Sequence, residues 1–354
     1  MRLTLLLLLT AALTTPQERP TVVLDNGAVE ATIDLAGGGL VSFHLTGSDL
    51  NPFMWEEGGA PAAPRPRGHF LCLDRWGAPS EAERANGMPY HGEASRVMWK
   101  VARHDKASVE MSADLPMAGL HIVRRSRLDA NGAVLRVTES VTNQRPLGRI
   151  YNMVQHPTIG PPFLDESTLV DANARRGFMQ SSPLPNPEEP SVYWPQALKD
   201  ALPVDLRHLT DDPMPNVVSY VIDQDHGWTT AVNPARRLLV GYVWKTADYP
   251  WFSAWRHAER GKPVARGLEF GTTGLHQPYP ILVKKGFIFG RPLFSHLDAG
   301  ETATRGYVLF LAQLPENYRG VASLEVSKEG LELTERGPGS PRTLRIAAPD
   351  PLND

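Results

Sequence analysis

The chain has 354 residues, with 36 basic and 39 acidic side chains and a single cysteine, Cys72. One cysteine excludes an intramolecular disulfide and any cysteine-rich metal site. The near-balance of charge, without a basic run, argues against nucleic acid as a partner.

The first residues predict a secretory signal peptide over residues 1–19. One positive charge at Arg2 precedes an apolar run over residues 3–13, and Pro16 follows soon after it. The run is too short to cross a bilayer of about 30 Å as a helix. Its consecutive leucines also lack the alternation of a half-buried strand. We therefore expect an exported protein, periplasmic or secreted, without membrane attachment after signal cleavage.

The rest of the chain has the patterns of an all-β protein. Short alternating or β-branched runs recur along it, separated by turn sequences such as Asp25-Asn26-Gly27 and Asn131-Gly132, which favour hairpins. The predicted strands are residues 21–24, 29–35, 40–45, 108–112, 120–128, 134–141, 217–222, 238–244, 307–311 and 343–347.

Strand patterns continue on both sides of two Pro-rich stretches, residues 60–68 and 182–190, which we interpret as loops rather than domain linkers. Only residues 195–201 resemble a short helix. The sequence shows no internal repeat of solenoid or propeller period. We predict one large antiparallel β-sandwich domain over residues 20–354, well beyond the size of an immunoglobulin-like sandwich.

Four polar segments place ionisable groups beside Gly, Pro or aromatic residues. They are Leu73-Asp74-Arg75-Trp76-Gly77, Pro89-Tyr90-His91-Gly92-Glu93-Ala94, Val154-Gln155-His156-Pro157-Thr158-Ile159-Gly160 and Gly267-Leu268-Glu269-Phe270-Gly271. Sugar sites combine aromatic faces, which pack on the ring, with charged donors for the hydroxyls. A histidine beside Gly or Pro is more often a loop residue than a catalyst. A glutamate in an apolar strand, as at Glu269, is costly to bury unless it is paired or functional.

The order of these segments resembles the galactose mutarotase (aldose 1-epimerase) superfamily. Residues 31–45 are similar to the family's opening hairpin, with its Gly-rich turn. Tyr90-His91-Gly92, followed by Trp99, resembles its His-Gly segment. Gln155-His156-Pro157 after a strand, and Gly267-Leu268-Glu269 near the C-terminus, fall where the family has its second histidine and its glutamate. The resemblance covers most of the chain after the signal peptide and implies a large antiparallel β-supersandwich.

The resemblance also implies a role for each matched residue. His156 corresponds to the general acid that protonates the ring oxygen, and Glu269 to the general base that takes the proton of the anomeric hydroxyl. His91 resembles the histidine that helps to hold the ring oxygen and hydroxyls. Arg75 matches the substrate-binding arginine, and its neighbour Asp74 is an equally good candidate for binding the sugar hydroxyls.

This combination suits the opening of a hemiacetal, in which one oxygen loses a proton while another gains one. Each such transfer contributes about 10²- to 10⁴-fold, and the chemistry requires no metal or organic cofactor. We expect His156, Glu269, His91 and Arg75 to converge in one open cleft that takes a mono- or oligosaccharide.

The sequence departs from the family pattern at several positions. Glu93 stands where the family has a second glycine after its histidine. The family's additional aspartate has no aligned position, and the candidate for it is Asp248. Trp255, with Trp251 and Arg256, could form a divergent pocket around the sugar. These differences leave open which sugar is bound and whether it is turned over.

Metal and serine chemistry fit the sequence less well. His91-Gly92-Glu93 matches the His-x-Glu of zinc deaminases, but a single cysteine cannot supply their Pro-Cys-x-x-Cys motif. A zinc hydrolase built on His91, Glu93 and His156 lacks the helical two-histidine motif. No Gly-x-Ser-x-Gly sequence indicates a serine hydrolase.

Two other functions remain open. One is a non-catalytic carbohydrate-binding protein on the same fold, and the other is an exported glycosidase or lyase. A glycosidase requires two carboxylates about 5 to 9.5 Å apart, for which Glu269 and Glu93 are the pair to examine.

Overall fold

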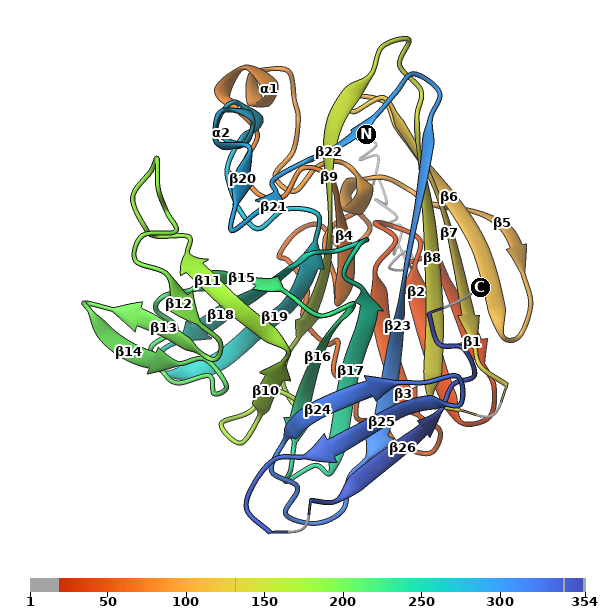
Figure 1. Cartoon of the computed structure of the whole chain (residues 1–354). Helices are drawn as coiled ribbons and strands as arrows, with labels where there is room; N and C mark the ends of the chain where they lie inside the picture. The colour runs from red at the N-terminus through yellow and green to blue at the C-terminus, as the bar shows by residue number, and fades with distance from the viewer. Residues whose placement is uncertain (1–18, 131, 340, 353–354) are drawn as a thin grey trace, which may run out of the picture.

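The computed structural model describes residues 19–130, 132–339 and 341–352, and antiparallel strands make up most of it (Figure 1). It confirms the predicted fold class, an all-β supersandwich of large antiparallel sheets. Apart from its last residue, the predicted signal peptide lies outside the described residues. Within the described part of the chain, no helix is both long and apolar enough to span a bilayer.

The first large sheet has eleven strands, with β9 near its centre between β4 and β19. Across the sheet the strands are β1 (Thr21–Asp25), β2 (Val29–Asp34), β3 (Leu40–Leu45), β4 (His69–Asp74), β9 (Arg149–Ile159), β19 (Lys262–Gly271), β18 (Trp251–Glu259), β15 (Val217–Ile222), β11 (Ala174–Met179) and β12 (Val192–Tyr193), with β22 (Ser295–Leu297) also paired to β9.

The second large sheet has eight strands and packs against the first. In order they are β10 (Leu169–Ala172), β16 (His226–Asn233), β17 (Leu238–Lys245), β23 (Thr302–Gln313), β8 (Val134–Asn143), β7 (Leu120–Leu128), β6 (Ser108–Leu115) and β5 (Lys100–His104). Apolar side chains of both sheets form one large buried cluster, which includes Leu268 and Phe270 of β19 and Leu309 of β23.

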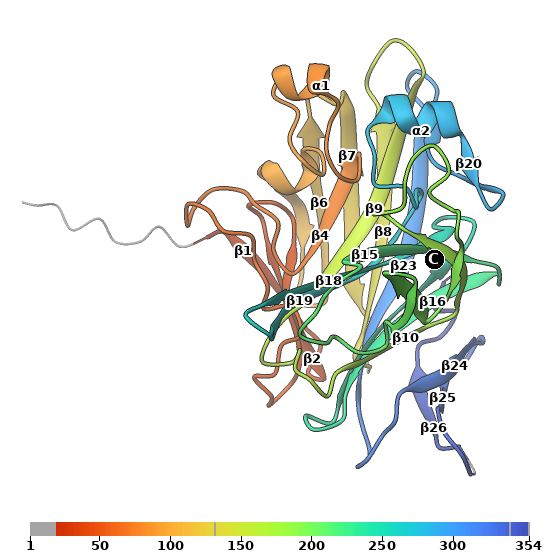
Figure 2. The ribbon, with the colours of Figure 1, turned by 90° about the vertical axis from the view of Figure 1, so that its left-hand side faces the viewer.

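The remaining elements are small. They are the hairpins β13 (Gln196–Lys199) with β14 (Leu202–Asp205) and β20 (Phe287–Ile288) with β21 (Arg291–Pro292), the three-stranded sheet β24 (Val321–Val326), β25 (Gly330–Glu335) and β26 (Thr343–Ala347), the helices α1 (Glu81–Ala85) and α2 (Tyr279–Lys285), and the 3₁₀ turn Ala94–Arg96. Figures 1 and 2 show α1 and α2 at one end of the sandwich and β24–β26 at the other.

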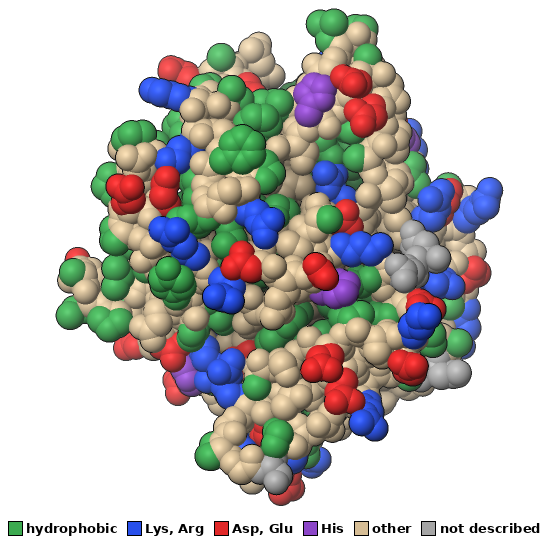
Figure 3. All heavy atoms as spheres, viewed as in Figure 1, with side chains coloured by type: hydrophobic (Ala, Val, Ile, Leu, Met, Phe, Trp, Pro, Cys, Tyr) green, Lys and Arg blue, Asp and Glu red, His purple; other side chains and the backbone are tan. Residues whose placement is uncertain are grey.

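On the face in Figure 3, acidic and basic side chains are interspersed.

The predicted strands over residues 40–45, 120–128, 217–222 and 343–347 coincide with β3, β7, β15 and β26. Strands β7 and β8 pair as the predicted hairpin, although Asn131 itself lies outside the described residues. The helix predicted over residues 195–201 is wrong, because these residues belong to the β13–β14 hairpin. Its turn holds Asp200 and Ala201 at φ of 49° and 64°, a backbone region that a helix does not use.

Candidate functional site

His156 and Glu269 lie opposite each other on neighbouring strands. The register of β9 with β19 sets them directly across the ladder. The same row continues to Phe70 on β4 and to Ser253 on β18. Because side chains alternate across a sheet, Leu268 next to Glu269 enters the main core, whereas this row faces away from it. His156 therefore lies within a strand, not after one as the sequence indicated.

Phe70, His156 and Glu269 of this row form the floor of a cleft of about 490 Å³. The cleft is lined by Trp55, Glu57, Pro66, Phe70, Trp76, Tyr90, His91, His156, Gln180, Ser181, Asn216, Val217, Trp255, Glu269 and His276. Aromatic walls with a few convergent polar groups are typical of small-molecule sites.

The side chains of His156 and Glu269 are in direct contact. His156 Nε2 lies 3.3 Å from Glu269 Oε1, and the side chains are 7% and 1% exposed. The indole N–H of Trp76 donates to Glu269 Oε2 at 2.6 Å. On the far side of the imidazole, Nδ1 lies 2.9 Å from the hydroxyl of Thr158, and the ring stacks on Phe70 at 4.2 Å. Each member is therefore held from both sides.

Burial shifts the proton affinities of this pair in opposite directions. It raises the pKa of Glu269 to about 8, although the hydrogen bond from Trp76 works against this rise. It lowers the pKa of His156 to about 3, and His276 lowers this pKa further. Both shifts favour the uncharged forms, because burial penalises charge. Near neutral pH the pair therefore holds one transferable proton.

Two further histidines line the cleft as neutral groups. The backbone N–H of Gly77 donates to Nδ1 of His91 at 3.0 Å, so Nε2 carries the hydrogen of the neutral ring. His276 Nε2 lies 3.1 Å from the hydroxyl of Tyr90, and its backbone N–H donates to Gln180. Burial lowers the pKa of His91 well below its ordinary value and that of His276 to about 4.

The structure brings four of the predicted site residues to this cleft: His91, His156, Trp255 and Glu269. Trp255 lies two residues along β18 from Ser253, the cross-strand partner of Glu269, and its ring is 5.7 Å from that of His156.

The side chains of Arg75 and Asp74 do not line the cleft, contrary to the expected convergence. Asp74 is fully buried and forms ion pairs with Arg75 and Arg149, and Arg75 also pairs with Glu83 of α1. Asp74 ends β4 in a left-handed conformation, at φ of 82°. The chain turns there, so Trp76 reaches the cleft instead.

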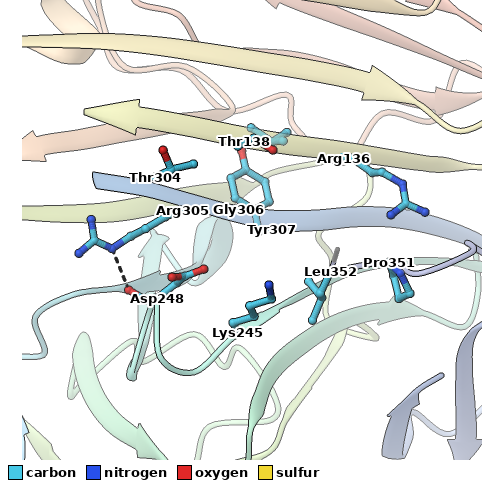
Figure 4. A pocket seen from close by; sticks show the side chains of 11 residues that line it. Arg136, Thr138, Lys245, Asp248, Thr304, Arg305, Gly306, Tyr307, Pro351 and Leu352 are labelled. Carbon is cyan, nitrogen blue, oxygen red and sulfur yellow. Dashed lines mark hydrogen bonds between the residues drawn. The ribbon is translucent and has the colours of Figure 1, made fainter. Parts of the chain in front are cut away.

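Glu93 and Asp248 also lie away from the cleft lining. Glu93 is buried and accepts the backbone N–H groups of Met117 and Ala118, so it is not a partner carboxylate for Glu269. Asp248 lines a different pocket of about 190 Å³, together with Lys245 and Arg305 (Figure 4). Among the described residues, no group of three or more His, Cys, Asp or Glu side chains could hold a metal ion.

Sequence reasoning missed several residues of the cleft. Trp76 and Tyr90 stand inside two of the four polar segments, where their charged or ionisable neighbours are the more conspicuous candidates. His276 follows Glu269 by seven residues in a Gly-rich context, and this context could have indicated a further site residue. Trp55 had no local signal, because only the fold brings it over Phe70.

The fold has many relatives among solved structures. A galactose mutarotase related enzyme from Lactobacillus acidophilus aligns with a TM-score of 0.60 at 15% identity, covering 84% of this chain and 99% of that one. A galactose mutarotase-like protein from Lactobacillus casei aligns at 0.60 and 16% identity, covering 83% and 100%. One from Clostridium acetobutylicum aligns at 0.60 and 15%, covering 84% and 96%.

Comparison with models of protein families gave no match, and comparison with curated proteins gave none either. The structural alignments nevertheless span most of this chain and nearly the whole of each partner. The chain therefore has the fold of the galactose mutarotase-like proteins.

Proposed function

We propose that the protein acts on a sugar as an aldose 1-epimerase, interconverting anomers by opening and closing the hemiacetal ring. The observation that carries this proposal is the buried contact between His156 and Glu269 on the floor of an aromatic cleft. The fold of galactose mutarotase-like proteins supports it.

The pair has what the reaction needs, a donor and an acceptor side by side. The anomeric hydroxyl O1 and the ring oxygen O5 are bonded to the same carbon, so both can meet the pair at once. The pair takes the proton from O1 and gives its own proton to O5, which breaks the bond between C1 and O5. After rotation of the aldehyde, closure reverses both transfers, and the pair ends with the one proton it held at the start.

The pair can begin this cycle in either of two tautomers. The family roles have His156 as the acid and Glu269 as the base. The raised pKa of Glu269 and lowered pKa of His156 favour the reverse starting state, a carboxylic acid beside a neutral imidazole. Both tautomers carry the same number of protons, and the two groups exchange roles on ring closure.

The neutral histidines beside the pair suit the binding of hydroxyls and of the aldehyde oxygen. His91 offers Nε2–H as a donor, because Gly77 occupies its other nitrogen. His276 and Tyr90 share a hydrogen bond and can exchange it for a bond to a sugar. Such donors stabilise charge that develops on oxygen when the ring opens.

A second candidate is a non-catalytic sugar-binding protein on the same fold. The cleft itself favours it, because its aromatic walls and hydrogen-bonding side chains could hold a glycan without any proton transfer. A retaining or inverting glycosidase is less well supported, because Glu93 does not line the cleft and Glu57, the other carboxyl residue of the lining, is held in an ion pair by Arg96.

We also propose that the protein is exported, on the strength of the apolar run over residues 3–13 and the charge before it. Expression of the full chain with mass spectrometry of the mature N-terminus tests this. Cleavage within residues 15–19 supports export, and an intact Met1 in the soluble fraction contradicts it.

Polarimetry of freshly dissolved α-glucose and α-galactose, with calorimetric titration of the same sugars, tests the catalytic proposal. We expect the wild-type protein to accelerate the approach to anomeric equilibrium. Binding without acceleration for any aldose tested would favour the sugar-binding protein. New reducing ends or unsaturated products from an oligosaccharide would favour the hydrolase or lyase.

A further inference from the structure

The aromatic rings of the cleft form a chain of contacts with His156 in its middle. On one side the ring of Trp255 lies 5.7 Å from that of His156, and Trp55 lies 5.7 Å from Trp255. On the other side His91 lies 5.4 Å from His156, and His276 lies 5.7 Å from His91. The His156–Glu269 pair thus lies between an aromatic end, Trp55 and Trp255, and a histidine end, His91 and His276, which the rings of Tyr90 and Trp76 also contact.

The residues of the aromatic end are held in place by packing and by hydrogen bonds. Trp55 stacks on Phe70 with ring planes 25° apart, and its backbone carbonyl accepts the N–H of Gly68. A side chain at Gly160 would come within 3.2 Å of the backbone nitrogen of Trp55, so the two segments pack closely. Trp255 meets the indole of Trp55 edge to face, at 81°. Together the two indoles form a corner that can pack on the C–H faces of a sugar.

The corner also has an exposed polar group beside it. Asn216 precedes Val217, the cross-strand partner of Trp255, and its side chain lines the same cleft. Its backbone carbonyl accepts the N–H of Arg256, which fixes its position, while its exposed carboxamide remains available for hydroxyl groups.

No lysine or arginine is among the described residues that line the cleft. Its two carboxyl residues are Glu269 and Glu57, and Glu57 already forms an ion pair with Arg96. A phosphorylated or acidic sugar would find no cation there to offset the loss of its hydration. The lining therefore favours an uncharged ligand.

The cleft is also larger than one sugar ring needs. Its volume of about 490 Å³ lies in the range of about 300–1,000 Å³ that holds drug-sized ligands. A reducing sugar would present C1, with O1 and O5, to the His156–Glu269 pair. Further residues are attached at the opposite edge of the ring, so an oligosaccharide extends away from the pair.

We propose that Trp55 and Trp255 form a second sugar subsite, so that the ligand is an uncharged reducing oligosaccharide of two or more residues. Its reducing ring lies against Trp255 with C1 at the His156–Glu269 pair, and its second ring lies in the corner at Trp55. This inference rests on the proposed function for the position of C1. The subsite itself follows from the cleft and its rings.

Calorimetric titration of the wild-type protein, Trp55→Ala and the matched control Phe287→Ala tests the subsite. Phe287 is an aromatic residue, 63% exposed, that does not line the cleft. The probes are glucose and galactose, the disaccharides maltose, cellobiose and lactose, and glucose 6-phosphate and glucuronic acid as charged sugars. Circular dichroism and thermal melting establish that each variant is folded.

We expect at least one disaccharide to bind the wild type about tenfold or more tightly than its monosaccharide, and both charged sugars to bind more weakly than glucose. Trp55→Ala should reduce the disaccharide-to-monosaccharide affinity ratio at least about fivefold, and Phe287→Ala should leave this ratio unchanged. Equal loss for both sugar sizes, tighter binding of a charged sugar, or no preference for any disaccharide would overturn the subsite.

Polarimetry on the same samples keeps this result separate from the proposed function. Selective loss of disaccharide binding without mutarotation by the wild type would retain the subsite and reject the epimerase. Mutarotation of monosaccharides without any disaccharide preference would retain the epimerase and reject the subsite.

Discussion

At the scale of single residues, the proposed chemistry depends on one proton shared by His156 and Glu269. Their heavy atoms are 3.3 Å apart, and burial moves both pKa values toward the uncharged state. The histidine and the glutamate could be proposed from the sequence, because an isolated glutamate between Leu268 and Phe270 needs a reason. Their direct contact could not, since it follows from the register of β9 and β19.

The shared proton predicts the pH dependence of mutarotation. A carboxyl whose pKa is raised to about 8 keeps its proton below that pH and loses it above. We therefore expect kcat/KM, corrected for the uncatalysed rate, to be nearly flat from pH 5 to 7 and to fall as pH rises through about 8. A fall centred near 6.5, the ordinary pKa of histidine, would indicate a free imidazolium acid instead.

Trp76 is expected to tune this titration. Its indole N–H donates to Glu269 Oε2, which opposes the rise of the carboxyl pKa. Trp76→Phe keeps an aromatic ring but removes the donor. The high-pH decline of kcat/KM should therefore move to higher pH in this variant. A profile that loses amplitude without moving would mean that Trp76 only packs against the site.

At the scale of elements, the sequence predicted strands better than it predicted turns. Alternation identified β7 and β15 to the residue, because burial of one face leaves a period of two. In the β13–β14 turn, Asp200 and Ala201 have positive φ. This pair does not indicate a hairpin turn in the sequence as strongly as Asn-Gly does. Helix α1 was missed although Ser80 and Glu83 form a capping box around its start.

The turn after β4 decides which side chains enter the cleft. Gly77 has φ of 95°, and a Cβ there would lie 2.6 Å from the imidazole of His276. Its N–H also binds His91. Arg75 and Asp74 looked like site residues because their charge was visible in the sequence. The backbone turn that brings Trp76 and Gly77 inward instead was not visible.

Substitution at Gly77 should therefore affect binding as well as stability. Gly77→Ala incurs about 1–2 kcal/mol of backbone strain from its positive φ and also displaces His276. Gly87→Ala is the matched control, since Gly87 has φ of 89° but a Cβ there meets only Met117, at 3.8 Å. Urea titration should show losses of similar order, while sugar affinity falls only in Gly77→Ala. Equal affinities in the two variants would contradict this role of Gly77.

At the scale of the whole molecule, a buried polar network joins the two large sheets behind the site. Gln155, next to His156, donates to Glu139 on β8, and Glu139 pairs with Arg124 on β7 at 2.6 Å. Gln155 also contacts His69 on β4. Composition and alternation predicted a sandwich, but they could not show which polar side chains cross its core.

Breaking this network should destabilise the fold strongly. Arg124→Met leaves Glu139 buried without its cation, which costs about 3–5 kcal/mol. Arg125→Met is the control. Arg125 follows Arg124 on β7, but it is 61% exposed and pairs with Glu110, a contact worth about 1 kcal/mol or less. Urea titration of both variants and the wild type gives the loss in free energy of unfolding for each substitution. A similar small loss in both variants would show that the buried pair contributes little.

The most direct test of proton transfer by the His156–Glu269 pair compares the mutarotation rate of Glu269→Gln with its sugar affinity. Glutamine keeps the shape and much of the hydrogen bonding but cannot take or give the carboxyl proton. Polarimetry on fresh α-glucose and α-galactose should show a loss of at least about 10²-fold, while calorimetry shows that sugar binding is retained. Glu259→Gln, at the exposed end of β18, should keep the wild-type rate. An undiminished rate in Glu269→Gln would contradict the account.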